Sequence, residues 1–297
     1  MYKEIAIIAP TASGKTALSI RLAHKLNAVI LSLDSLAVYK KIDIASAKPT
    51  VAERDGIIHF GIDCVFPDEV FDVIEFYEEY DKAKSHAMKN NKNLIIVGGT
   101  GFYLKALIDG LSKTPKISNE TKKSVKDEMQ RLPALYEKLS LLDPLYMQKI
   151  AATDKYRIEK AAEIYFETGT IPTQYFMENK AVGKVENLCI YEIETDPEIL
   201  RQRIKLRTKM MLENGLIDEV IRLEKEYTRA PNCMNSIGIS EVFDYLDSKI
   251  SKKELEELIS IHTAQLAKRQ RTFNKSQFKN VQKVPLAKME ELIVSQH

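Results

Sequence analysis

The chain has 297 residues and a formal net charge of +2, with 44% hydrophobic and 29% charged residues, the balance of a folded protein with a proper core. No apolar run approaches the roughly 20 residues that a membrane span requires, and the first residues lead into an apolar run without the form of a signal peptide. The cysteines Cys64, Cys189 and Cys233 are too far apart for a CxxC metal site and odd in number, which argues against a disulfide framework. We therefore expect a cytoplasmic protein without membrane contact.

Short apolar runs alternate with helical patterns along the first hundred residues. Residues 5–9, 29–33 and 93–97 have the composition of buried parallel strands. Residues 16–26 carry leucines four positions apart, and residues 72–90 read as a helix that is charged on its outer face. Strand, helix and strand in alternation predict a parallel α/β sheet whose functional loops lie at the carboxyl ends of the strands.

The character of the sequence changes at about residue 114. From there to about residue 182 it shows helical periods rich in Lys and Glu, with prolines between them and no convincing strand. Residues 188–193 then read as one more strand, and most of the chain up to about residue 277 as helical. We therefore predict a core made of residues 1–113 and 183–297, with a helical insert domain over residues 114–182.

A phosphate-binding loop follows the first predicted strand. The stretch APTASGKT over residues 9–16 fits a P-loop, with Ala9 in place of the usual leading glycine. In such a loop, backbone N–H groups and a helix N-terminus surround a phosphate, Lys15 supplies a positive charge and Thr16 can ligate Mg²⁺. The loop follows a buried strand and opens a helix, which is the context that the motif requires. The sequence therefore predicts a phosphate site here.

Two further loops end predicted strands. Asp34 opens the stretch DSLAVY and could ligate Mg²⁺ through water, act as a general base, or cap the following turn. The glycines around Thr100 let the backbone approach a ligand closely, and the Thr100 hydroxyl can donate to an oxyanion. Since a P-loop usually indicates a kinase or an NTPase, a small-molecule kinase is the main alternative at this point.

These three loops, in this order, resemble those of the tRNA dimethylallyltransferase family, whose P-loop binds dimethylallyl diphosphate and not ATP. The resemblance covers most of the chain and continues through LDPLYMQKIAATDKYRIEKAAEIYFETG, RIKLRTKMMLENGLIDEV, SIGISEVFDYLD and TAQLAKRQRTF. It implies a P-loop NTPase-like α/β core with a helical, tRNA-binding insert. It also implies that a dimethylallyl group is transferred to N6 of adenine 37 in the anticodon loop of tRNA, with Mg²⁺ as cofactor.

The resemblance assigns roles to individual residues. Asp34 matches the catalytic aspartate that accepts a proton from N6, Thr100 a catalytic threonine near the reacting oxygen of the diphosphate, and Arg207 an arginine that closes on the pyrophosphate. The residues implied in binding the diphosphate are Thr11, Ala12, Ser13, Gly14, Lys15, Thr16 and Arg203. The residues implied in contacting tRNA are Asp34, Ser35, Leu36, Ala37, Thr100, Lys122, Tyr156, Arg157, Ile158, Glu159 and Lys160.

Other features bear on the acceptor. Residues 268–283 are rich in Lys and Arg and contain no acid, so they would track RNA phosphates. Ile239-Ser240 and Phe273 depart from the Tyr-Lys and Trp that are usual in the family, which we expect to alter RNA docking and not the class of reaction. No obligate protein partner is evident. The remaining alternatives are an enzyme that acts on free AMP or ADP, and an RNA-binding protein whose loop binds an anion.

Overall fold

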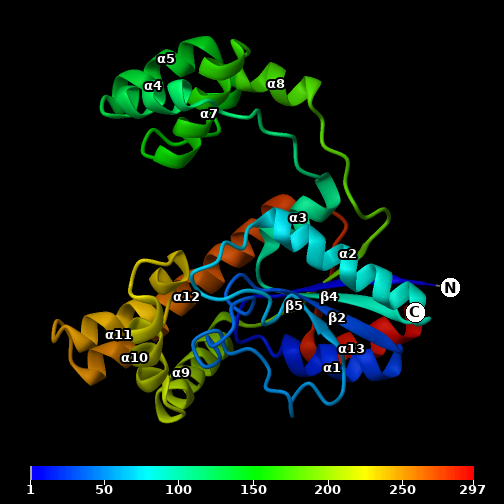
Figure 1. Cartoon of the computed structure of the whole chain (residues 1–297). Helices are drawn as coiled ribbons and strands as arrows, with labels where there is room; N and C mark the ends of the chain where they lie inside the picture. The colour runs from blue at the N-terminus through cyan, green and yellow to red at the C-terminus, as the bar shows by residue number, and fades with distance from the viewer. Residues whose placement is uncertain (1) are drawn as a thin grey trace. The chain divides into compact units, whose positions relative to one another are not determined.

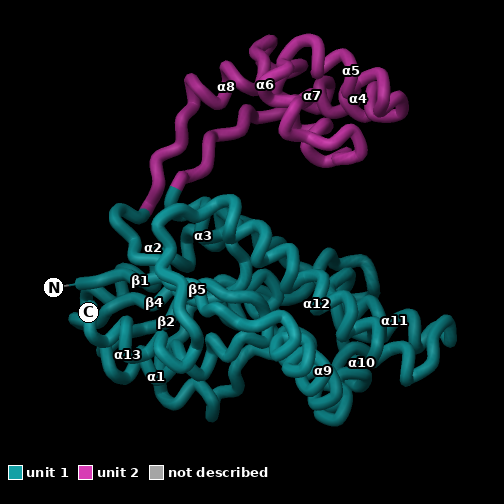
Figure 2. The backbone as a smooth tube through the Cα atoms, turned by 180° about the vertical axis from the view of Figure 1, so that it is seen from behind, with its two compact units in different colours: residues 1–108, 185–297 teal, residues 109–184 magenta. Residues whose placement is uncertain are grey.

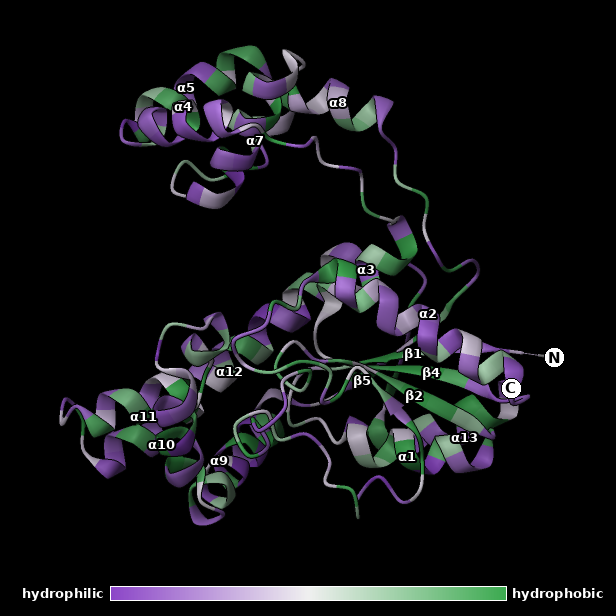
Figure 3. Cartoon of the chain, in the orientation of Figure 1, coloured by the Kyte–Doolittle hydropathy of each residue, from purple (hydrophilic) through white to green (hydrophobic). Residues whose placement is uncertain are grey.

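The computed structural model describes residues 2–297 and contains a six-stranded sheet in the order β3-β2-β4-β1-β5-β6, with every neighbouring pair parallel (Figure 1). The strands are β1 (Glu4–Ile8), β2 (Ala28–Leu33), β3 (His59–Phe60), β4 (Asn93–Gly98), β5 (Cys189–Glu194) and β6 (Gln282–Pro285). The central strands are uniformly hydrophobic (Figure 3), because a parallel sheet is covered on both faces. The predicted parallel α/β fold is confirmed.

Each face of the sheet has its own helices. Because successive side chains of a strand point to opposite faces, Ile5 and Ile7 of β1 join one core and Ala6 and Ile8 join the other. The helices on the first face are α1 (Lys15–Lys25) and α13 (Leu286–Gln296), and those on the second are α2 (Val73–Lys89) and α3 (Gly101–Asp109). The covered faces leave the carboxyl edge of the sheet as the place for a ligand.

A group of helices adjoins the segment that follows β2. Val38, Tyr39 and Ile42 from that segment share a hydrophobic core with these helices. The helices are α9 (Pro197–Glu213), α10 (Leu216–Tyr227), the short 3-10 helix η1 (Asn232–Asn235), α11 (Ile239–Leu246) and α12 (Lys252–Gln277). Leu200 and Ile204 of α9 pack against Ala267 of α12. No helix within residues 2–297 is both long and apolar enough to cross a membrane.

The chain divides into two compact units (Figure 2). Unit 1 holds the sheet and the helices named so far, and unit 2 consists of residues 109–184. Unit 2 has a hydrophobic core of its own, which includes Val125, Leu135, Leu139 and Ile158. Its helices are α4 (Asn119–Met129), α5 (Leu132–Leu142), α6 (Pro144–Met147), α7 (Lys155–Thr168) and α8 (Pro172–Glu178).

The C-terminal part of unit 1 differs from what its composition suggests. The basic run over residues 268–283 is not one continuous surface, because α12 ends at Gln277 and the chain then enters β6. Lys283 in β6 pairs with Glu192 of β5, with 2.9 Å between Nζ and Oε2. Strand β6 and helix α13 therefore extend the sheet and its covering layer, where the sequence analysis predicted no element.

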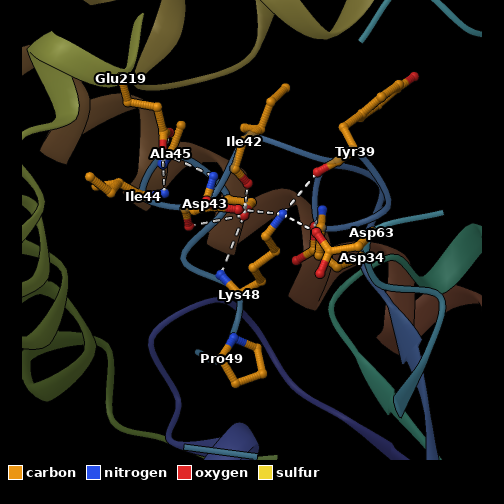
Figure 4. A network of polar contacts seen from close by, with 12 residues as sticks. Asp34, Tyr39, Ile42, Asp43, Ile44, Ala45, Lys48, Pro49, Asp63 and Glu219 are labelled. Atoms are coloured by element: carbon orange, nitrogen blue, oxygen red, sulfur yellow. Dashed lines mark hydrogen bonds and ion pairs between the residues drawn. The ribbon is translucent and has the colours of Figure 1, made fainter. Parts of the chain in front are cut away.

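The segment after β2 is fastened by two buried charged groups (Figure 4). The Glu219 carboxylate on α10 is 2% exposed and accepts hydrogen bonds from the backbone N–H groups of Asp43, Ile44 and Ala45 at 3.0, 2.8 and 2.9 Å. The Lys48 ammonium donates to the Tyr39 carbonyl at 2.9 Å and pairs with the carboxylates of Asp43 and Asp63. This clamp ties residues 37–48, which follow Asp34, to the helices beside them.

Replacing Glu219 by alanine would leave three backbone donors without their acceptor, that of Ala45 in a buried place and those of Asp43 and Ile44 in partly buried ones. We expect the Glu219→Ala variant to lose about 2–4 kcal/mol of unfolding free energy, since unpaired buried donors are costly. Urea unfolding followed by circular dichroism measures this loss. Glu213→Ala is the matched control, because Glu213 is an exposed residue that pairs with the exposed Lys209 at 3.8 Å, and it should change the free energy by less than about 0.5 kcal/mol. Equal effects in the two variants would contradict the clamp.

Candidate functional site

The phosphate-binding loop joins β1 to α1 at the carboxyl edge of the sheet. Ala12 and Gly14 have φ values of 63° and 88°, in the left-handed region, and Gly14 is the N-cap of α1. No side chain caps this helix end, so the N–H groups of its first turn are free to meet an anion. Ala9 is fully buried at the end of β1 with an ordinary negative φ, so its methyl group is accommodated where a glycine is usual.

Two arginines from α9 reach the same loop. Arg203 donates to the Ser13 carbonyl at 3.2 Å, and Arg207 donates to the Thr11 hydroxyl at 2.9 Å. The two lie four residues apart, on one face of the helix. With Lys15 they bring three cationic side chains to one short loop, as a diphosphate requires.

The electrostatics of this group are dominated by burial. Burial lowers the pKa of the Lys15 ammonium to about 8, while the Asp34 carboxylate opposes the shift and Arg207 adds to it. Burial likewise lowers the pKa of the Arg207 guanidinium, again opposed by Asp34. Burial therefore makes the charged forms of Lys15 and Arg207 less favourable, and an incoming anion would offset this cost in free energy.

Asp34 and Thr100 follow neighbouring strands and meet at the sheet edge. One oxygen of the Asp34 carboxylate accepts from the N–H groups of Leu36 and Ala37 at 2.9 and 3.2 Å, which fixes the turn after β2. The other oxygen has no hydrogen-bond partner among residues 2–297. The N–H group of Thr100 donates to the Leu33 carbonyl at 3.0 Å, which holds the end of β4 beside Asp34.

A cavity of about 180 Å³ brings seven of the predicted residues of unit 1 together, namely Thr11, Lys15, Asp34, Ser35, Leu36, Thr100 and Arg207. Polar groups from the P-loop, from both strand ends and from α9 line it, and apolar side chains form the rest of its wall. The polar lining includes Thr11, Lys15, Asp34, Thr100 and Arg207, and the apolar lining includes Leu36, Ile204, Met211, Ile237 and Leu266. An anion site and a carboxylate acceptor thus share one chamber with an apolar wall.

Thr16 lies in a smaller hollow that also contains Lys15, Ser32, Asp34 and Lys48. Within residues 2–297 there is no cluster of three or more His, Cys, Asp and Glu side chains that could hold a metal ion. A cation that takes most of its ligands from phosphate oxygens and water, as Mg²⁺ does, fits this sparse donor set, with the Thr16 hydroxyl as a protein ligand.

The predicted RNA contacts beyond residue 108 lie in unit 2. Lys122 is exposed on α4, and the first turn of α7 exposes Tyr156, which is 69% accessible. Arg157 pairs with Asp154, and Lys160 pairs with Glu163. Glu159 is half-buried. Ile158 is fully buried in the core of unit 2, so its side chain is not available to RNA, which corrects the expectation for that residue.

The structure adds Gln270 on α12 to the cavity wall, a residue that the sequence analysis did not select. Its side-chain carbonyl accepts from the Thr11 N–H group at 3.0 Å. A signal was present in the pattern of α12, where Leu255, Ile259 and Leu266 form an apolar stripe that Gln270 continues. A polar residue at an apolar position of an amphipathic helix is a candidate for a buried role.

Comparison with known proteins bears on what this site does. Residues 37–277 match the family model described as IPP transferase. The chain is 55% identical over 293 residues to the tRNA dimethylallyltransferase of Sulfurovum sp., covering 98% of this chain and 97% of the relative. It is 59% identical over 278 residues to the protein of the same name in Aliarcobacter butzleri, covering 94% and 93% of the two chains.

Solved structures agree with these relatives. The tRNA isopentenylpyrophosphate transferase of Bacillus halodurans superposes with a TM-score of 0.73 at 30% identity, covering 100% of this chain and 95% of that one. A eukaryotic dimethylallyltransferase acting on tRNA gives a TM-score of 0.82 at 26% identity, covering 99% and 77%. The P-loop, the two strand-end loops and the arginines of α9 thus occur in a chain that aligns with these enzymes over nearly its whole length, and the chain belongs to the IPP transferase family.

Proposed function

We propose that this protein transfers a dimethylallyl group from dimethylallyl diphosphate to N6 of adenine 37 in tRNA and releases pyrophosphate. The observation that carries the proposal is the shared cavity, in which a diphosphate-type anion site and the Asp34 carboxylate face one space with an apolar wall. The family membership fixes the class of reaction. The apolar wall suits an allylic donor, and the free carboxylate oxygen suits an amine acceptor.

The chain's part in the bond-breaking step is to stabilise the leaving group. The bond between C1 of the allylic donor and the diphosphate oxygen breaks, and its electron pair leaves with pyrophosphate. Lys15, Arg207 and the N–H groups at the start of α1 meet the negative charge as it grows, and such preorganised donors are a major source of catalysis. Mg²⁺ held by Thr16 and the diphosphate oxygens would neutralise further charge on the leaving group.

The chain's part in the bond-making step is to place the nucleophile. The free oxygen of Asp34 accepts a hydrogen bond from the 6-amino group, directs it toward C1 and takes its proton as the new N6–C1 bond forms. The Thr100 hydroxyl donates to an oxygen of the diphosphate. The target adenine must leave its stack to enter such a cavity, as in other base-modifying enzymes.

The acceptor in this proposal is the anticodon loop of tRNA. In unit 2 the exposed Lys122, Tyr156 and Arg157 supply cations and an aromatic ring, the groups that bind RNA phosphates and bases. In unit 1 Ser35, Leu36 and the exposed Lys268 and Arg269 of α12 supply further contacts. Ala37 is 3% exposed, so its side chain is not available to RNA, which corrects the expectation for that residue. We propose that unit 2 is a tRNA-binding insert and that the enzyme works in the cytoplasm on tRNA.

Asp34→Asn keeps the shape of the side chain, and its carbonyl can still accept from Leu36 and Ala37, but the basicity is lost. We expect dimethylallyl diphosphate binding and the melting temperature to stay close to wild type. Single-turnover transfer to an anticodon stem-loop should slow by about two to four orders of magnitude. A near-normal rate would contradict the role of Asp34 as the proton acceptor.

The pKa of Lys15 near 8 predicts a pH dependence. In the free enzyme Lys15 is charged below about pH 8 and neutral above it, so kcat/KM for dimethylallyl diphosphate should fall as the pH rises through 8. Lys15→Arg stays charged over this range and should give a lower kcat/KM without the inflection. The profile is measured from pH 7 to 9.5 at saturating RNA. The same inflection in Lys15→Arg would assign it to another group.

Salt dependence tests the RNA path along α12. Replacing Lys268, Arg269 and Arg271 together by alanine should flatten the log–log dependence of tRNA affinity on salt by about 0.7–0.9 for each phosphate that these side chains neutralise. Affinity for dimethylallyl diphosphate should hardly change. The matched control replaces Lys25, Lys89 and Lys92, which precede β2 or β4 at the opposite edge of the sheet, and should leave the slope unchanged. A lower melting temperature with an unchanged slope would mean that the α12 residues only pack on the core.

A further inference from the structure

Gln270 presents an unused hydrogen-bond donor to the cavity. Its Oε1 accepts from the backbone N–H of Thr11 at 3.0 Å. A backbone N–H can only donate, so this contact identifies the terminal atom that faces Thr11 as the oxygen and the other as Nε2. Nε2 carries two N–H groups, and neither has a hydrogen-bond partner among residues 2–297. The side chain is thus anchored through its acceptor while its donor is left for something else.

Gly99 makes room for this amide. A Cβ built on Gly99 would overlap the Gln270 Nε2 atom and lie 3.1 Å from its Cδ. The φ of Gly99 is outside the positive range, so the backbone itself does not require a glycine there. The space that a side chain at residue 99 would take is therefore occupied by Gln270, which lies directly beside the loop that carries Thr100.

The free donor faces the cavity in which the acceptor base and the diphosphate would meet. Gln270 lines the 180 Å³ cavity together with Asp34 and Thr100. Thr11, Lys15 and Arg207 of the anion site line the same cavity. The neighbours of Gln270 on the same wall include Leu266 and Ile237, which would face an uncharged ring and not a phosphate.

We propose that Gln270 reads the acceptor base: its Nε2 donates to the ring nitrogen beside the 6-amino group, N1 or N7, while Asp34 accepts from that amino group. This rests on the proposed function. Adenine offers a donor at N6 next to an acceptor in the ring, and side-chain amides commonly read this pair. Here the Asp34 carboxylate would recognise the N6 donor and the Gln270 amide would recognise the ring acceptor. Guanine, with an acceptor at position 6, would set its oxygen against the Asp34 carboxylate.

The test removes the two candidate ring nitrogens of the target adenine, N1 and N7, one at a time. Anticodon stem-loops with adenine, 1-deazaadenine or 7-deazaadenine at position 37 are given to wild type and to Gln270→Met and Gln270→Glu, and single-turnover transfer is measured. Gln270→Glu keeps an acceptor for the Thr11 N–H, whereas Gln270→Met removes both groups. The quantity compared is the ratio of the transfer rates for the two deaza bases in each enzyme. This ratio in wild type should differ from the ratio in either variant by about three- to tenfold. The comparison between enzymes cancels the intrinsic reactivity of each base.

Gly99→Ala provides a second route, because its methyl group displaces the amide without changing Gln270, and it should remove the same discrimination. Dimethylallyl diphosphate affinity reports the anchoring of Thr11 separately, so it should fall in Gln270→Met, which loses the acceptor, and in Gln270→Glu, whose added carboxylate faces the anion site. Equal deaza ratios in wild type and in both Gln270 variants would overturn the proposal and leave Gln270 as an anchor of the P-loop. Failure of wild type to modify the ordinary adenine would instead overturn the proposed function.

Discussion

The structure depends on holding positive charge around one short loop. Lys15, Arg203 and Arg207 all contact the P-loop backbone or side chains, and burial lowers the pKa of both Lys15 and Arg207. Asp34 is the carboxylate that opposes both shifts. Arg203 is exposed and Lys15 and Arg207 are half-buried, and like charges brought this close repel one another, so the arrangement is costly until an anion arrives. The groups that meet the diphosphate are therefore in place before it binds, as preorganised catalysis requires.

Much of unit 1 serves to hold these groups in their positions around the site. The sheet sets the P-loop, Asp34 and Thr100 at the ends of three adjacent strands, and the packing of α9 on α12 aims two arginines at the loop. Glu219 and Lys48 then fasten the segment after Asp34 with buried hydrogen bonds. Gln270 of α12 adds a further contact, because its side-chain carbonyl accepts from the N–H group of Thr11 in the P-loop. The helices beyond the sheet thus position the groups of the site through specific hydrogen bonds and packing contacts.

The sequence predicted those parts of the site that lie in local motifs. The P-loop, Asp34 and Thr100 each follow a strand directly, so their context could be recognised from a few neighbouring residues. Glu219 and Gln270 could not be found in this way, since each reaches a partner more than 170 positions away, although both lie in stretches that carry the family resemblance. The last strand and helix were missed for a different reason. The basic composition before them suggested a solvated run without regular structure, whereas the exposed Lys283 belongs to the edge strand β6 and pairs with Glu192 of β5.

The most direct test is one incubation of the enzyme with dimethylallyl diphosphate labelled in its allylic carbons, without ATP. Two anticodon stem-loops are compared, one with adenine and one with guanine at position 37. The account predicts that label enters only the adenine-bearing RNA and that one pyrophosphate is released for each group transferred. No label in either RNA, together with phosphate transfer when ATP is added, would contradict it and identify the P-loop as the site of a kinase.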